Sequence, residues 1–212
     1  MINNCGLIHG WFNELPRIKF PFDEKEIPLN GIYVLFEKGE KAHNRKDRIV
    51  RIGTHTGDDQ LRSRLKQHFI NENKDRSIFR KNIGRALLSK NKDSFLKNWE
   101  IDLTTKEAKG KYSGSMDFKK QKEVEKEVSK YIQNNFSFIV FEVENKERRL
   151  ELESQIISTI SLCSSCNSSK NWLGNHSPKD KIKGSGLWLV NELYKDSLSD
   201  GNIKYLKNIL FN

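Results

Sequence analysis

The chain has 212 residues, enough for one domain with extensions and too few for two full domains. Charged residues make up 31% of it and the formal net charge is +10, which favours an anionic partner such as nucleic acid, although solvated surface lysines explain the same charge equally well. The sequence has no apolar run of about 18 residues and no signal-peptide pattern at its start, so we expect a cytoplasmic protein with no membrane partner.

Residues 1–29 are predicted to form an irregular N-terminal arm, because aromatic residues are mixed with three prolines there. The expected role of the arm is to pack on the domain and to cover the edge of a sheet. The aromatic residues concerned are Trp11, Phe12, Phe20 and Phe22.

A β-hairpin is predicted next. Residues 31–36 and 49–53 are rich in β-branched and aromatic side chains, which is typical of strands. Residues 38–48 between them are polar and contain Gly39, so they are expected to form a long hairpin tip.

A helix is predicted from about residue 60 to residue 70, with Leu61, Leu65 and Phe69 on the stripe that faces the core. Arg64 and His68 lie on or beside that stripe. A guanidinium and an imidazole aimed at a core are costly unless they meet a buried carboxylate or a bound anion. The pattern therefore indicates a partner of negative charge for this helix.

The middle of the chain is expected to be scaffold with one insert. Residues 75–90 predict an amphipathic helix whose basic face either contacts a DNA backbone or is simply exposed, two interpretations of equal weight. Residues 103–117 are polar and predict an inserted loop, the kind of surface segment whose side chains can reach base edges in a groove of nucleic acid. Residues 118–134 predict a scaffold helix. The basic residues of the first helix are Arg76, Arg80, Lys81 and Arg85.

A buried strand is predicted at residues 136–143, from a nearly continuous apolar run, followed by a helix at 147–161. Glu153 falls on the apolar stripe of that helix, as Arg64 does on the earlier one. Two residues of opposite charge on the apolar stripes of two helices, Arg64 and Glu153, suggest a shared site. A buried ion pair between Arg64 and Glu153 is the alternative, and it is a poor stabilising device because desolvation offsets most of the attraction.

The C-terminal part holds two further predictions. Residues 187–198 and 203–211 are expected to form two closing helices that pack on the core or on a second subunit. Three cysteines in all fit a reducing compartment better than a disulfide framework. Cys163 and Cys166 form a Cys-x-x-Cys motif that is either a pair of small residues or part of a zinc site completed by His176.

Five elements in order resemble the GIY-YIG nuclease superfamily. They are Gly31-Ile32-Tyr33, Arg51-Ile52-Gly53, an arginine with a histidine one turn later on the next helix, a glutamate on a later helix and an asparagine after it. Residues 64–68 and 174–178 are similar to segments of the restriction endonucleases in that superfamily. The matching residues beyond the tripeptides are Arg64, His68, Glu153 and Asn167.

The resemblance implies an α+β fold with a small, mixed or antiparallel three-stranded central sheet, flanked by helices and extended by further helices and loops. It places the nuclease core at residues 30–178, with the insert at about 103–117, and leaves residues 179–212 as a C-terminal helical extension. It also implies a metal-dependent endonuclease, in this branch a type II site-specific restriction enzyme that cuts double-stranded DNA.

The same resemblance implies partners and leaves alternatives. A homodimer on DNA is expected because palindromic sites match a two-fold axis, and a companion methyltransferase is expected for a restriction enzyme. One alternative is a structure-specific nuclease of repair or recombination. The other is a DNA-binding module that has lost catalysis, because Arg51 stands where the family pattern has its second tyrosine.

The resemblance assigns Tyr33 as the general base. A phenol in water loses its proton near pH 10, so a cation must assist it. Arg51, His55 and His68 are the candidates for that cation.

The remaining roles concern the scissile phosphate and the metal. Arg64 is expected to hold the phosphate bidentately, and Glu153 to bind a single Mg²⁺, for which Mn²⁺ is a substitute. Asn167 and His68 are expected to orient the phosphate or the base.

Overall fold

A computed structural model describes residues 4–211 of the chain. Residues 1–3 of the predicted arm and residue 212 of the predicted extension lie outside the described part. Within residues 4–211 the fold is α+β, with one antiparallel sheet of four strands in the order β1-β4-β2-β3. The strands are β1 (Ile18–Lys19), β2 (Gly31–Lys41), β3 (Asp47–Gly53) and β4 (Phe136–Glu142).

The predicted three-stranded sheet is wrong by one strand. The additional strand, β1, comes from the N-terminal arm and pairs Ile18 with Phe138 at the outer edge of β4. An unpaired edge of β4 would leave backbone donors and acceptors without partners. The arm therefore covers a sheet edge, as expected, but does so by forming a strand.

The arm is also not irregular at its start, because α1 (Asn4–Glu14) is a helix. Ile8 and Phe12 lie one turn apart and are both fully buried. The Phe12 ring stacks on Phe141 of β4, with ring centroids 5.6 Å apart. The sequence did not predict this helix, because its apolar stripe is short and two glycines interrupt it.

The hairpin has longer strands and a shorter tip than predicted. Ala42 and Lys46 close the tip with a backbone hydrogen bond of 2.9 Å. Arg48 and Glu40, which fall within the predicted polar tip, form a buried ion pair with a 2.6 Å contact. Because the two opposite charges neutralise each other inside the protein, the strands can extend through these positions.

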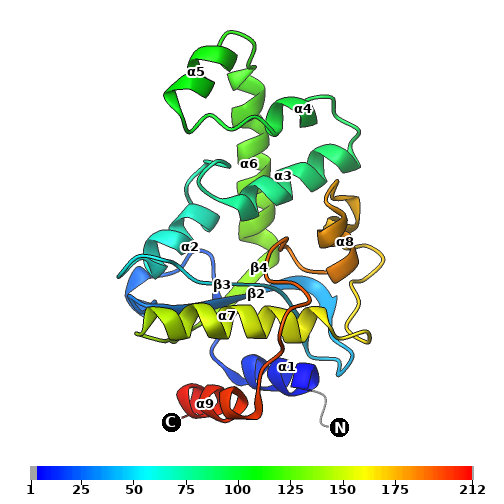
Figure 1. The fold of residues 1–212 in the computed structure, drawn as a ribbon. Coiled ribbons are helices and arrows are strands. Elements are labelled where there is room, and N and C mark those ends of the chain that lie inside the picture. The colour runs from blue at the N-terminus through cyan, green and yellow to red at the C-terminus, as the bar shows by residue number, and fades with distance from the viewer. Residues whose placement is uncertain (1–3, 212) are drawn as a thin grey trace.

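Helices cover both faces of the sheet (Figure 1). On one face Tyr33, Leu35 and Val50 belong to a core shared with α2, α3 and α6. On the other face Ile32 and Val34 belong to a core shared with α1, α7 and α9. Because both faces are buried, β4 reads as a continuous apolar run, as predicted. The bounds are α2 (Leu61–Phe69), α3 (Ile78–Lys90), α6 (Phe118–Asn135), α7 (Lys146–Ser161) and α9 (Asp200–Phe211).

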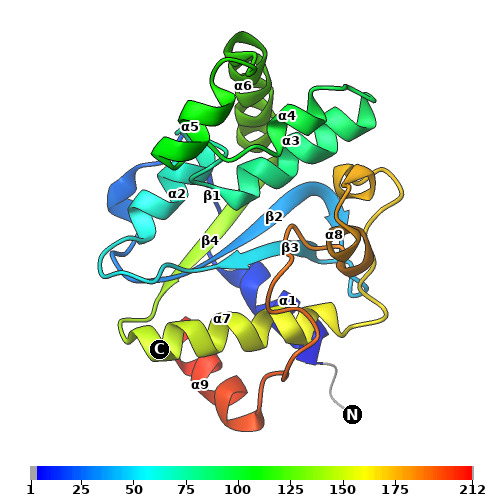
Figure 2. The same ribbon diagram turned by 45° about the horizontal axis from the view of Figure 1, so that its top comes forward.

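The segment between α3 and α6 projects away from the sheet, next to the start of α6 (Figures 1 and 2). It holds α4 (Leu96–Trp99) and α5 (Lys106–Tyr112). The predicted loop at 103–117 thus contains a short helix, because Thr105 caps its first turn by accepting a hydrogen bond from the Ala108 N–H. None of the residues of α5 is buried.

The basic face predicted for the helix at 75–90 is only partly exposed. Arg80, Lys81 and Arg85 are buried, and only Arg76 of this set is exposed. The three buried cations contact carboxylates of other segments, namely Glu125, Asp75 and Glu100. For these three residues, neither the DNA-contacting face nor the exposed face predicted from the sequence is correct.

The predicted helix at 187–198 is wrong, whereas the one at 203–211 is confirmed as part of α9. The helix before it, α8 (Asp180–Ser185), ends at Gly186, which adopts a left-handed conformation with φ of 68°. Residues 187–198 then run as irregular chain, and the Trp188 N–H donates to the Val50 carbonyl at 2.7 Å. Short 3-10 turns occur at Glu24–Glu26 and Leu173–His176. Each helix within residues 4–211 is too short or too polar to cross a lipid bilayer.

Candidate active site

A cleft of about 400 Å³ opens between the hairpin and its covering helices. β3, α2, α3 and α7 each contribute side chains to it, and the irregular segment after α8 closes one side. Figure 2 shows α7 and α2 on opposite sides of the hairpin, with α7 running alongside β3. The polar residues that line the cleft are Arg51, Arg64, Asn82, Glu153, Asn191 and Glu192.

Two glycines of the hairpin explain how the strands fit together here. Tyr33 of β2 lies opposite Gly53 of β3, and a Cβ at Gly53 would lie 2.1 Å from the Tyr33 hydroxyl oxygen. A Cβ at Gly31 would lie 2.2 Å from the Phe141 carbonyl oxygen of β4. Any larger residue at either position would push a neighbour aside. Gly53 therefore makes room for the Tyr33 ring over β3, and Gly31 lets β2 lie close against β4.

The Tyr33 hydroxyl joins two of the predicted site residues. Its oxygen lies 2.8 Å from Nε2 of His68 on α2 and accepts a hydrogen bond from Nε of Arg51 at 3.2 Å. Arg51 also donates from Nη1 to the Trp188 carbonyl at 2.5 Å. The Tyr33 side chain is fully buried, so its hydroxyl lies behind Arg51, which lines the cleft.

His68 is neutral. Complete burial lowers its pKa well below the usual value, and the nearby guanidiniums of Arg51, Arg64 and Arg80 lower it further. Its Nδ1 lies 2.7 Å from Oγ of Ser77, the residue that caps the start of α3. Because His68 carries no charge, Arg51 is the cation that contacts the phenol.

Arg64 reaches the cleft from α2 with unused hydrogen-bonding capacity. Its Nη1 donates to the Gln67 side chain at 3.2 Å and to the Arg76 carbonyl at 3.3 Å. Its Nε is buried and has no hydrogen-bond partner. Among the described residues its acceptors are thus uncharged, and the predicted alternative of an Arg64 to Glu153 ion pair is not observed. Such an arginine is ready to bind an anion.

Glu153 enters the cleft from α7. Its Oε1 accepts a hydrogen bond from the Thr54 N–H at 3.1 Å. Burial raises the pKa of this carboxyl to about 7, and the opposing effect of the Arg51 charge is smaller. A carboxylate that is costly to keep charged gains from a cation, since a bound metal offsets the desolvation.

Two predicted site residues lie elsewhere. His55 lines a neighbouring cavity, and both of its ring nitrogens contact backbone, Nε2 with the Gly31 N–H at 3.4 Å and Nδ1 with the Gly57 carbonyl at 2.6 Å. Burial lowers its pKa, so it does not supply the cation for Tyr33. Asn167 is exposed, donates to the Ser164 carbonyl at 3.2 Å and lines a different cavity.

Asn82 and Asn191 line the cleft and were missed from the sequence. Asn191 lies in the segment predicted as a helix, where an asparagine reads as an exposed position. The signal that was available is the Gly-Ser-Gly sequence at 184–186, which favours a helix end followed by irregular chain. Asn82 lies on α3, where neighbouring residues such as Arg80 and Arg85 pair with carboxylates from other segments, so its local pattern does not mark it as a site residue.

The cleft brings together guanidiniums on one side and a carboxylate on the other, with a phenol and a neutral imidazole behind them. Guanidiniums suit a phosphate group, and a carboxylate suits a divalent cation. A family model described as GIY-YIG domain matches residues 17–210. The chain belongs to the GIY-YIG family. The match begins within the predicted arm and ends within the predicted extension, and it includes each of the predicted site residues.

Membership in the GIY-YIG family gives this chain a nuclease domain, with DNA as the expected substrate, and nucleases of this family generally depend on a divalent metal ion. The comparison with curated proteins finds no match, and neither does the comparison with solved structures. The GIY-YIG fold of this chain carries Arg51 in place of the second motif tyrosine, and the guanidinium contacts Tyr33 directly.

Proposed function

We propose that this GIY-YIG protein is a type II site-specific restriction endonuclease that hydrolyses phosphodiester bonds of double-stranded DNA. The observation that carries the catalytic part is the cleft in which Arg64 and Glu153 face a common space without pairing with each other. The similarity of residues 64–68 and 174–178 to restriction enzymes supports the finer assignment. None of residues 174–178 lines the cleft, so this similarity concerns the scaffold.

Arg64 holds the scissile phosphate in this proposal. Its guanidinium presents a buried Nε without a partner, and a phosphate oxygen would satisfy that donor. Arg51 lines the same cleft and adds a second positive charge. Together the two arginines offset the charge that develops on the non-bridging oxygens during hydrolysis.

Glu153 is the residue that fits a metal ion. Its carboxylate is partly buried, accepts a single hydrogen bond among the described residues and, with a pKa of about 7, is poised between charged and neutral forms. Oxygen ligands of this kind suit Mg²⁺, with Mn²⁺ as a substitute. When bound, the ion supplies a Lewis acid that stabilises the leaving 3′ oxygen. Asn191 and Asn82 provide uncharged amide groups beside it to orient the phosphate.

Tyr33 is the proposed general base. Its oxygen lies 2.8 Å from Nε2 of His68 and accepts a hydrogen bond from Nε of Arg51 at 3.2 Å. These two contacts orient the phenol oxygen that would take the proton of the attacking water. Because Tyr33 is fully buried and Arg51 lines the cleft, the water must reach the hydroxyl from the cleft side, past Arg51.

As a restriction enzyme the protein acts on DNA as a homodimer, since one active site cuts one strand and a palindromic site has two-fold symmetry. A companion methyltransferase in the cytoplasm protects the host DNA in such a system.

The test is to incubate the protein with phage and plasmid DNA in Mg²⁺ or in EDTA and to separate the products on a gel. Discrete bands that require Mg²⁺ are expected. A smear would contradict the restriction assignment and favour a repair-type or non-specific nuclease. Intact DNA that migrates as a complex would show that catalysis has been lost and would turn attention to Arg51.

A further inference from the structure

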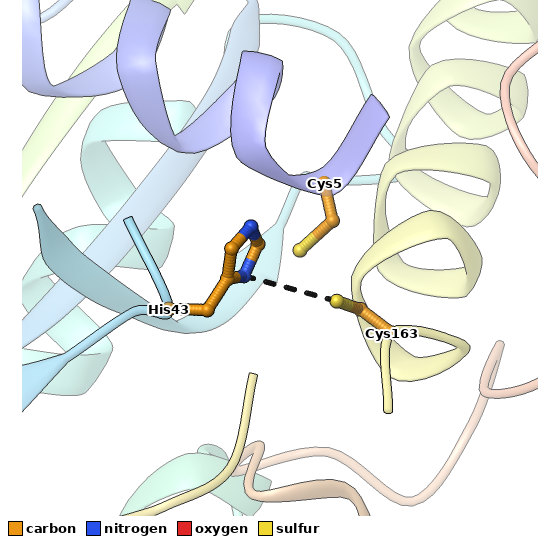
Figure 3. A group of neighbouring side chains, drawn as sticks. All are labelled: Cys5, His43 and Cys163. Carbon is orange, nitrogen blue, oxygen red and sulfur yellow. Dashed lines mark hydrogen bonds between the residues drawn. The ribbon is translucent and has the colours of Figure 1, made fainter. Parts of the chain in front are cut away.

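All three cysteines of the chain meet at one place, on the opposite side of the hairpin from α2. Cys5 comes from α1, while Cys163 and Cys166 follow the end of α7. His43 lies at the tip of the hairpin. Figure 3 shows the side chains of Cys5, His43 and Cys163 pointing toward one another from these three segments. Cys5 lies far from the Cys-x-x-Cys motif in the chain, so its place beside the motif was not predicted from the sequence.

The distances suit a metal centre. The Sγ of Cys163 lies 3.9 Å from Nδ1 of His43. The ligand atoms of Cys5, His43 and Cys163 all lie within 4.8 Å of one another. Around a tetrahedral zinc ion, with bonds of about 2.0 to 2.3 Å, neighbouring ligand atoms are roughly 3.4 to 3.8 Å apart. The group therefore needs only small side-chain adjustments to surround one ion.

Cys166 belongs to the same cluster through Cys5. The Cys5 thiol is within hydrogen-bonding reach of the thiols of both Cys163 and Cys166. Cys166 also receives a hydrogen bond from the backbone N–H of His43, a contact that stabilises a thiolate. The turn that contains both cysteines is closed by the Cys166 N–H, which donates to the Cys163 carbonyl at 3.3 Å. Cys166 thus borders the group of Cys5, His43 and Cys163, and its Sγ lies 3.8 Å from Nε2 of His9, with which it and Cys5 form a second group.

A second histidine, His9, lies beside this group but has another task. Its Nε2 accepts a hydrogen bond from the Ile49 N–H at 3.2 Å, and its Nδ1 lies 2.8 Å from the Cys5 carbonyl. The Nε2 contact therefore holds α1 against β3, while the Nδ1 contact lies within α1. Binding a metal through His9 would break one of these buried contacts, which is costly.

We propose that Cys5, His43 and Cys163 bind one structural Zn²⁺ ion, and that Cys166 completes the set after its side chain turns from His9 toward the ion. Three thiolates and one imidazole form a closed four-coordinate set typical of structural zinc and leave no position for substrate. The predicted completion of the site by His176 is wrong, because His176 lies in the Leu173–His176 turn and is not part of the cluster.

The ion would tie together the two elements that carry the cleft. The hairpin carries Arg51 and α7 carries Glu153, and the cluster joins the tip of the hairpin to the end of that helix. The proposal does not depend on nuclease activity, so it stands or falls separately from the proposed function.

The experiment measures metal content of the full-length protein, prepared with Zn²⁺ and a reducing agent and then freed of loose metal by gel filtration. One zinc ion per chain is expected by mass spectrometry. Replacement by Co²⁺ should give the sulfur-to-metal charge-transfer band and the strong visible bands of a tetrahedral thiolate site. A chelator should lower the melting temperature of the wild-type protein, because the cluster links three segments.

Matched variants locate the site. Cys163→Ser should abolish the zinc, and His43→Ala should bind Co²⁺ at least about tenfold more weakly. His176→Ala, in which an exposed histidine outside the cluster is removed, should keep the metal.

The proposal would be overturned by zinc-free wild-type protein after this preparation, by equal Co²⁺ affinity of the His43 and His176 variants, or by a native disulfide between two of the cysteines. The wild-type measurements decide the matter even if Cys163→Ser fails to fold.

Discussion

Two arginines of neighbouring helices, Arg80 and Arg64, show how differently the protein treats the same side chain. Arg80 is fully buried, and its Nε and Nη2 donate to the Glu125 carboxylate at 3.0 and 2.7 Å. Arg64 faces the cleft, with its Nε left without a partner. A buried cation with all its hydrogen bonds made is part of the scaffold, whereas one with capacity left over is available to a ligand.

The two regions are connected through His68. Nη1 of Arg80 donates to the His68 carbonyl at 3.2 Å, and the His68 side chain contacts Tyr33. The scaffold ion pair thus supports the backbone that positions the proposed base. We therefore expect changes at the Arg80 and Glu125 pair to act on folding and changes in the cleft around Arg64 to act on catalysis.

The largest effect is expected from Arg80→Met. Removing one partner leaves the Glu125 carboxylate buried without its cation, which costs about 3 to 5 kcal/mol of unfolding free energy. Urea unfolding followed by circular dichroism measures it. Adding Glu125→Leu should recover much of the loss, because the remaining charge is then removed as well. A stable single variant would show that the pair is not structural.

Glu153→Gln should lower the cleavage rate by about a hundredfold to a thousandfold, because the amide loses the charge that holds the metal ion. DNA binding, measured by gel shift, should be retained. The unfolding free energy at pH 8 should not fall. Cleavage at the wild-type rate would remove Glu153 from the proposed mechanism.

Arg64→Lys should reduce single-turnover cleavage by about tenfold to a hundredfold, since lysine keeps the charge but not the planar pair of donors. Its unfolding free energy should match that of the wild type. Arg80→Met should lose stability, whereas Arg64→Lys should lose activity and keep its stability. A large loss of stability in Arg64→Lys would mean that both arginines belong to the scaffold.

Tyr33→Phe tests the base more narrowly, because it keeps the ring and removes the hydroxyl. The cleavage rate should fall by about a hundredfold or more, and the rise of the rate with pH should change its shape. A wild-type rate with a wild-type pH profile would leave Tyr33 as a packing residue that holds Arg51 and His68 in place.

The smallest effect concerns pH. The pKa of Glu153 is raised to about 7, so cleavage should decrease as the pH falls below 7 and the carboxyl becomes protonated. The effect on stability has the opposite sign. A carboxyl with a raised pKa favours the folded state in its protonated form, so this contribution is present at low pH and is lost as the pH rises through 7.

The stability part is measured by comparing the wild type with Glu153→Gln at pH 5 and pH 8. The stability of the variant relative to the wild type should increase from pH 5 to pH 8, because glutamine has no charge to bury. A constant difference would show that Glu153 ionises as freely as in the unfolded chain.

The sequence predicted the parts of the site that depend on local pattern. Arg64 and Glu153 stood out because each interrupts the apolar stripe of its own helix, and both line the cleft. The hairpin and the buried strand followed from residue type and apolar runs, and the helices α2, α3, α6 and α7 followed from their apolar periodicity. The order of the family motif elements added the glycines and Tyr33.

What the sequence did not predict depends on residues far apart in the chain. Arg80 read as part of a basic surface, because the carboxylate that pairs with it lies on another helix. Asn191 read as a helical position, because the left-handed Gly186 and the contact of Trp188 with β3 decide the path of that segment. Helical periodicity describes one element and says nothing about its partners.

The pairing of β1 with β4 has a consequence for synthesis on the ribosome. Ile18 of β1 pairs with Phe138 of β4, so the sheet cannot be completed until β4 has left the ribosome. Until then the apolar face of α1 has no β4 to pack on, although it is made first. Because such distant contacts form late, the nascent chain exposes that face longest. A chaperone that holds the first thirty or so residues would be most useful to this protein during that interval.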